Sequence, residues 1–238
     1  MEFFLENQEL LWFMVVIYDL TLAIFLFKFF GKYGLYCAVV LGIILGNLQG
    51  GKVSELEVFG LSLTVSMGAI LYSGIYFATD LLNEKYGKNE ANRAVYLGFV
   101  ANIAVMVTLW VSTIFLPSDI TGSAAAVHNA ITTLATYSPI FIIGSLTAYL
   151  SSQVFDVWFF NYLKNKTGGK KLWLRNNLST LSSQLIDTLI YQFTWVLATD
   201  LSFYEAFSIA MAKYFIKAII AFVDTFFIYL VRNWKVPN

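Results

Sequence analysis

The chain has 238 residues, of which 58% are apolar and only 13% charged, and its 15 basic and 15 acidic residues leave no net charge. Soluble domains carry about 25% charged residues, so this composition excludes a soluble globular domain, and the charge balance excludes a nucleic-acid binder that relies on a basic surface. One cysteine, Cys37, and one histidine, His128, exclude an internal disulfide framework and give no basis for a metal centre.

Apolar runs of membrane-spanning length follow one another along the chain, at 10–30, 34–50, 63–83, 95–116, 138–163, 177–199 and 203–231. Helices of about 20 apolar residues cross a bilayer, so the runs predict an all-α polytopic membrane protein with six or seven transmembrane helices. Acidic residues at 2, 6 and 9 precede the first run, where a signal peptide carries positive charge, so this run is expected to stay in the protein. We expect one membrane domain over 1–238.

Basic residues mark one side of the predicted bundle. Twelve of the 15 lie in alternate connections or after the last run: Lys28, Lys32, Lys85, Lys88, Arg93, Lys164, Lys166, Lys170, Lys171, Arg175, Arg232 and Lys235. The opposite set of connections holds only Lys52. Because positive charge stays on the cytoplasmic side, the N-terminus is predicted outside and the C-terminus in the cytoplasm.

The longest external connection, 117–137, contains Pro117, Gly122 and a stretch of small residues at 123–126. Two interpretations stay open for it, a partly buried or re-entrant loop and a simple connector.

A polar repeat interrupts the fifth and sixth runs. The segments SSQVFD at 151–156 and SSQLID at 182–187 share one pattern on helices that run antiparallel, and the amide and carboxylate of each lie on one helix face. Counted from the flanking basic residues at about 1.5 Å per residue, each aspartate lies level with the glutamine of the other helix. The repeat predicts a nearly symmetric polar cluster near mid-membrane, formed by Gln153, Asp156, Gln184 and Asp187. Amides alone would serve helix association, whereas two buried carboxylates favour a substrate site.

Four further positions carry weaker signals. Asp80 lies near the cytoplasmic end of the third run, where it either faces a cavity or marks the membrane edge with Glu84. Lys217 is deep enough to need a carboxylate or a water-filled cavity, and Asp224 is either its partner or an interfacial residue. Asn47 lies in a helix with glycine at every fourth position, which indicates close helix packing and leaves room for a ligand.

The sequence lacks the motifs of the common hydrolases. It has no glycine-rich phosphate loop ending in Lys-Ser or Lys-Thr, no HExxH pair and no GxSxG elbow. We therefore expect no enzyme activity, no ATP hydrolysis and no cofactor.

An ordered set of segments is similar to the queuosine precursor transporters, also called vitamin uptake transporters. The set comprises GNLQGGK at 46–52, ATDLLNEKYGK at 78–88, SSQVFDVWFFNYLK at 151–164, SSQLIDTLIY at 182–191, and Lys217. The resemblance implies import of a 7-deazaguanine such as preQ0, preQ1 or queuine across the bacterial inner membrane, for salvage into tRNA modification. It implies substrate-binding roles for Asn47, Asp80, Gln153, Asp156, Gln184, Asp187 and Lys217.

The same resemblance places the family-like core at 34–232, with 10–30 as a peripheral helix whose Asp19 is not assigned. Lys52 would lie at the outer mouth, and a second carboxylate would balance the aminomethyl cation of preQ1 or queuine, a charge that preQ0 lacks. The expected partners are a small-molecule deazapurine and the lipid bilayer, with no nucleic acid. Energy coupling and a homodimer are left open.

Three other functions are weighed against a self-sufficient importer. One is a substrate-binding subunit that docks onto a separate energising module. Another is a seven-helix receptor or photosensor using Lys217 as a Schiff-base lysine, which Lys213 one helical turn earlier would oppose by like charge. A purely structural subunit is the third, and two buried carboxylates with an intramembrane lysine argue against it.

Overall fold

The computed structural model describes residues 7–58, 61–118, 122–136 and 139–236, and most of them are helical. Its elements in chain order are α2 (Gln8–Leu48), β1 (Val53–Val58), β2 (Leu61–Ser66), α3 (Met67–Tyr86), α4 (Lys88–Ser112), α5 (Ala124–Ala135), α6 (Pro139–Lys166), α7 (Leu172–Ala198) and α8 (Phe203–Val231). The predicted helical membrane architecture is confirmed in this general form. The acidic residues at 2 and 6 lie outside the described ranges.

Four of the described helices, α2, α4, α6 and α8, are long and apolar enough to cross a membrane. Their surfaces expose large apolar side chains, among them Phe25, Trp110 and Phe222. Water would not tolerate so much exposed apolar surface, whereas lipid does, and the chain is therefore a multi-pass membrane protein.

Helix α2 is broken at Gly31. This residue has φ 55° and ψ −132°, a left-handed backbone conformation that favours glycine because it has no Cβ. The break divides α2 into 8–30 and 32–48, close to the first two predicted runs. Lys32 follows the break, and its ammonium lies 2.9 Å from a carboxylate oxygen of Glu90 at the start of α4.

The glycines of α2 allow close contact with α3. A Cβ added at Gly42 would lie 2.6 Å from Ile75 Cγ1, and one at Gly46 would lie 2.9 Å from the Tyr72 ring. A Cβ on Gly68 of α3 would meet the carbonyl oxygen of Gly46. The predicted packing role of the glycine spacing is confirmed, since small residues let two helix backbones approach.

The all-α prediction is wrong at 53–58 and 61–66, which form the two antiparallel strands of a β-hairpin, with Val53 opposite Ser66. We expected a helix from residue 63, but α3 begins at Met67. Apolar and polar residues alternate over 55–58 and over 61–66, and Leu56 and Val65 are buried while Glu55 and Glu57 are exposed. A period of two residues fits a strand with one buried face better than a helix.

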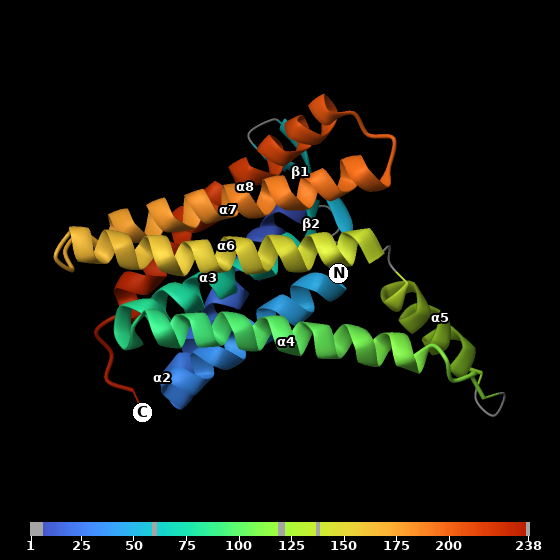
Figure 1. Cartoon of the computed structure of the whole chain (residues 1–238), viewed down its shortest axis with the longest axis horizontal. Helices are drawn as coiled ribbons and strands as arrows, with labels where there is room; N and C mark the ends of the chain where they lie inside the picture. The colour runs from blue at the N-terminus through green and yellow to red at the C-terminus, as the bar shows by residue number, and fades with distance from the viewer. Residues whose placement is uncertain (1–6, 59–60, 119–121, 137–138, 237–238) are drawn as a thin grey trace.

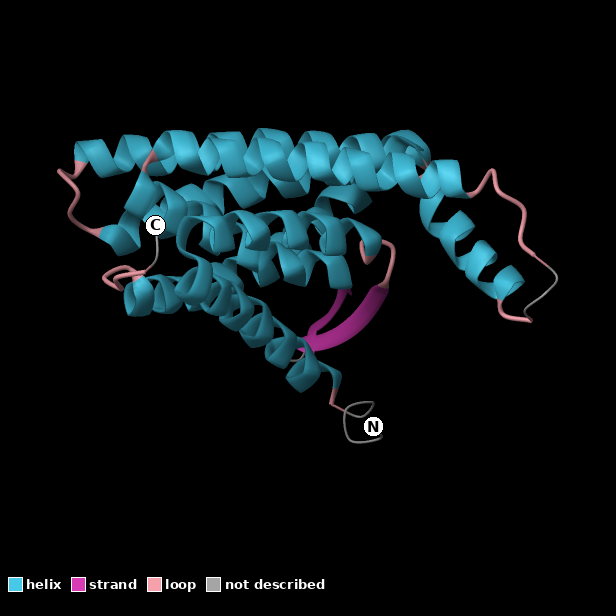
Figure 2. Ribbon diagram, turned by 90° about the horizontal axis from the view of Figure 1, so that it is seen from below, coloured by secondary structure: helices cyan, strands magenta, loops and turns pink. Residues whose placement is uncertain are grey.

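Within the 117–137 connection, residues 124–135 form helix α5, while 119–121 and 137 lie outside the described residues. Helix α5 projects from the end of the bundle where the hairpin also lies (Figures 1 and 2). The turn between α6 and α7 lies at the opposite end (Figure 1).

Helix α3 occupies the interior, in contact with α2, α4, α6 and α8. Most of its residues are buried, from Gly68 to Asn83. Helices α6, α7 and α8 run side by side across one side of the bundle (Figure 1), with α7 packed against both neighbours. The polar residues of α3, α6 and α7 therefore meet inside the protein.

Candidate functional site

A cavity of about 410 Å³ lies toward the end of the bundle that carries the hairpin and α5. Helices α2 to α8 and the hairpin all contribute to its wall. Its polar lining residues are Asn47, Lys52, Ser66, Tyr72, Asn102, Thr133, Ser145, Asp187, Thr188, Tyr191, Lys213 and Lys217. Three of the seven predicted site residues, Asn47, Asp187 and Lys217, thus face one space.

An ion pair between α7 and α8 forms part of the wall. The Lys217 ammonium donates to Asp187 Oδ2 at 2.5 Å and to the Thr188 hydroxyl at 3.2 Å. The side chains are 12% and 8% exposed, so the pair is shielded from the surroundings yet borders the cavity. Lys217 is therefore paired with Asp187 and not with Asp224. Asp224 is itself 1% exposed and so is not an interfacial residue.

Asn47 is held by neighbours on two helices. Its side-chain nitrogen donates to the Ile43 carbonyl at 2.9 Å, and its Oδ1 accepts from the Ser145 hydroxyl at 2.5 Å. The bond to Ser145 joins the C-terminal part of α2 to α6. Asn47 borders the cavity with both ends of its amide already bonded, so it positions the wall around a ligand.

Asn102 of α4 was missed by the sequence analysis. It is 1% exposed and lines the cavity, and neither atom of its amide has a hydrogen-bond partner within the described part of the chain. An unpaired buried amide costs free energy unless a ligand or water satisfies it. A single asparagine in an apolar run gave no pattern from which this could be predicted.

Lys213 lies one turn before Lys217 on α8. Its ammonium donates to Gln192 Oε1 at 3.1 Å and lies 5.9 Å from the Tyr191 ring centroid and 5.8 Å from that of Trp195. None of the ion pairs among the described residues involves Lys213. The cavity thus has a second cation near its aromatic wall.

The other four predicted site residues lie in a buried polar layer that does not border the cavity: Asp80, Gln153, Asp156 and Gln184. The Ser183 hydroxyl donates to Asp156 Oδ1 at 2.9 Å, and the Thr180 hydroxyl donates to Asp80 Oδ2 at 3.2 Å. The carboxyls of Asp80 and Asp156 are themselves within hydrogen-bonding reach of each other.

The two repeats are therefore not equivalent. Asp187 points to α8 and the cavity, whereas Asp156 points to α7 and α3. Gln153 accepts from the Thr79 hydroxyl at 3.3 Å and so belongs with α3 as well.

Asp19, which the sequence left unassigned, accepts hydrogen bonds from the backbone N–H of Gly74 at 2.7 Å and from the Ser73 hydroxyl at 3.1 Å. It connects the first half of α2 to α3 and does not border the cavity. A structural role follows from these contacts.

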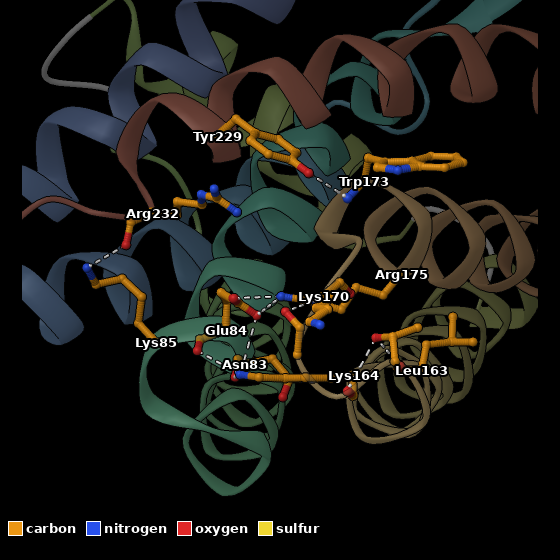
Figure 3. A network of polar contacts seen from close by, with 12 residues as sticks. Asn83, Glu84, Lys85, Leu163, Lys164, Lys170, Trp173, Arg175, Tyr229 and Arg232 are labelled. Atoms are coloured by element: carbon orange, nitrogen blue, oxygen red, sulfur yellow. Dashed lines mark hydrogen bonds and ion pairs between the residues drawn. The ribbon is translucent and has the colours of Figure 1, made fainter.

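At the end of the bundle opposite the hairpin, charged side chains connect α3, α6 and α7 (Figure 3). Arg175 donates to both carboxylate oxygens of Glu84, at 2.6 and 2.7 Å, and Lys164 lies 3.3 Å from the same carboxylate. Lys85 donates to the carbonyls of Arg232 and Trp234, at 3.0 and 2.7 Å. Glu84 thus joins helices and does not simply mark the membrane edge.

Comparison with known proteins shows the family to which the chain belongs. The family described as "Putative vitamin uptake transporter" matches residues 66–231. A "Probable queuosine precursor transporter" from Bacillus subtilis (strain 168) is 32% identical over 231 residues, which is 95% of each chain. No solved structure matches the chain. By the match to most of its length and by the identity to this relative, the chain belongs to the vitamin uptake transporter family.

Proposed function

We propose that this transporter imports 7-deazaguanine precursors of queuosine, such as preQ0, preQ1 or queuine, across the bacterial cytoplasmic membrane without hydrolysing ATP itself. The name of the Bacillus relative supports the substrate class. The observation that carries the proposal is the Asp187–Lys217 pair in the wall of the cavity.

The pair is complementary to the edge of a guanine-like base. That edge presents O6 as an acceptor beside two donors, N1–H and the exocyclic amine. A carboxylate accepts from two adjacent donors and an ammonium donates to an oxygen, so Asp187 and Lys217 together match the edge. The Asp187 carboxylate has acceptor capacity beyond its bond to Lys217, because each of its oxygens has two lone pairs.

The rest of the cavity suits a flat, polar ring. Tyr72, Phe141 and Tyr191 line it and offer aromatic faces for stacking. Its volume of about 410 Å³ lies in the range of small-molecule sites. The unpaired amide of Asn102 can donate to or accept from ring substituents. The four residues of the buried polar layer are proposed to shape the interior behind this site.

The predicted topology supports import as the direction of transport. The connections rich in basic residues are predicted to be cytoplasmic, and the hairpin and α5 belong to the opposite set of connections. The hairpin and α5 are then outside, and the cavity lies toward the external side. The Glu84–Arg175 network then closes the cytoplasmic end (Figure 3). A site placed near the outside and closed toward the cytoplasm is the arrangement that an importer needs to collect its substrate.

Binding to purified protein tests the proposal. We expect preQ0, preQ1 or queuine, but not adenine, to stabilise the detergent-solubilised protein in a thermal shift or calorimetric titration. Asp187→Asn removes a charged acceptor worth about 2 kcal/mol, so it is expected to weaken binding about thirtyfold. Asp200→Asn is the matched control, because Asp200 is exposed and outside the cavity.

Two results would contradict the proposal. One is a folded protein that none of the deazapurines stabilises, and the other is equal loss of affinity in Asp187→Asn and Asp200→Asn. Uptake by proteoliposomes containing this chain alone separates a self-sufficient importer from a substrate-binding subunit, which would bind the ligand without transporting it.

A further inference from the structure

The charges that border the cavity are unequal. Among the described residues, Lys52, Lys213 and Lys217 contribute three cations, and Asp187 contributes the one carboxylate. The nearest other carboxyls, those of the buried polar layer, do not border the cavity. The second carboxylate that would balance a cationic substrate is therefore absent from this described wall.

The carboxylate of Asp187 already forms an ion pair with Lys217. Asp187 lies 2.5 Å from the Lys217 ammonium, so much of its attraction for a ligand cation is cancelled. The Lys213 ammonium contacts an amide oxygen and two aromatic faces, and no carboxylate among the described residues pairs with it. Lys213 of α8 therefore adds a positive charge to the cavity that no carboxylate among the described residues offsets.

A ligand bound in this cavity stays close to the lysine charges. A cavity of about 410 Å³ is on the order of 10 Å across, so a cation on a bound ring stays within about one Debye length of the lysines. Interactions over this range are stronger at a partly buried site than in water. A cationic ring substituent is therefore repelled in any orientation that leaves Asp187 with the guanine-like edge.

From this charge distribution we infer that the cavity discriminates among deazapurines by the charge of the C7 substituent, favouring the neutral nitrile of preQ0 over the aminomethyl cation of preQ1. Lys213 is the residue assigned to this discrimination. The inference rests on the proposed function and deepens it, since it distinguishes between substrates that share the same hydrogen-bonding edge.

The test compares preQ0 with preQ1, which differ at one substituent. Dissociation constants are measured by calorimetry on the full-length purified protein at pH 7 and low ionic strength. We expect preQ0 to bind at least tenfold more tightly than preQ1. Lys213→Gln keeps a side chain of similar length and removes the charge, so it is expected to reduce the ratio of the two constants to about threefold or less.

Lys166→Gln is the matched control. Lys166 also lies near a tyrosine ring, 5.8 Å from that of Tyr162, but it is exposed and lies outside the cavity. The variant is expected to keep the wild-type ratio.

The outcomes separate the two proposals. Equal binding of preQ0 and preQ1, or tighter binding of preQ1, overturns the charge discrimination and leaves the proposed function intact. Preference for preQ0 that is unchanged in Lys213→Gln overturns the assignment to Lys213. Failure of a folded protein to bind preQ0, preQ1 and queuine overturns the proposed function, and the inference with it.

Discussion

The Glu84–Arg175 ion pair at the end of the bundle opposite the cavity is expected to contribute strongly to stability. Arg175 is 1% exposed, and its guanidinium contacts both oxygens of Glu84 as well as the carbonyls of Gly169 and Lys170. Breaking a buried pair by removing one partner costs about 3–5 kcal/mol, because it leaves the other charge uncompensated. Glu84 keeps Lys164 at 3.3 Å, so we expect about 3 kcal/mol, the lower end of this range, for Arg175→Met.

The chain offers a closely matched control in Arg93. Its ion pair with Glu90 has the same length, 2.6 Å, but the Arg93 side chain is 71% exposed. Exposed pairs contribute about 0–1 kcal/mol, so Arg93→Met is expected to change the free energy of unfolding by no more than about 0.5 kcal/mol. Burial is then the variable that separates the two substitutions.

The assay is denaturant unfolding of both variants in mixed micelles, with the free energy of unfolding extrapolated to zero denaturant. A double variant, Glu84→Gln with Arg175→Met, removes both charges of the pair and leaves Lys164, whose ammonium still donates to the carbonyls of Asn83 and Glu84. It is expected to recover at least half of the loss. Equal destabilisation by Arg175→Met and Arg93→Met would refute the reasoning. A double variant at least as unstable as Arg175→Met alone would also refute it.

Two further predictions concern the cavity and the helix packing. Asn102→Leu is expected to keep or raise the thermal stability, because it removes an unpaired buried amide. It is also expected to weaken deazapurine binding, measured by calorimetry, about tenfold. A loss of stability with unchanged affinity would contradict this prediction. Gly68→Ala is expected to lower the free energy of unfolding by about 1–3 kcal/mol, because the new Cβ meets the carbonyl oxygen of Gly46. A Cβ added at Gly122 meets no atom of the described residues within 4 Å, so Gly122→Ala is expected to be neutral. Similar effects of the two substitutions would exclude close packing as the cause.

The sequence predicts the membrane class, the approximate helices and the glycine packing, because these depend on local composition and spacing. A prediction from apolar runs misses the hairpin, because residues 63–66 lie at the start of the third run. The signal present in the sequence is the alternation of apolar and polar residues over 61–66, which has the period of a strand. The sequence also leaves the partner of Lys217 open. Asp224 on the same helix was a candidate, but Asp187 on α7 is the partner, and only helix packing decides between them.

The SSQxxD repeat predicts where polar residues lie along two helices, but not which of them face the cavity. Two six-residue segments with the same polar pattern, SSQVFD and SSQLID, predict a symmetric cluster, and they do lie on adjacent helices. Helix α7 is packed between α6 and α8, and Asp187 of α7 accepts a hydrogen bond from Lys217 on α8. Asp156 of α6 instead accepts from Ser183 on α7 and lies beside the Asp80 carboxyl of α3. The neighbours of each helix decide which aspartate faces the cavity, and neighbours are a property of the tertiary structure.

Helices α3 and α7 show why the polar site can exist in lipid. Neither is among the four described helices apolar enough to cross a membrane by composition. Each has a largely buried polar face, with Asp80 and Asn83 on α3 and Gln184 and Asp187 on α7. The surrounding apolar helices separate these groups from the hydrocarbon, where each unpaired polar group would cost several kcal/mol. The low hydropathy of α3 and α7 thus marks the segments that form the interior of this transporter.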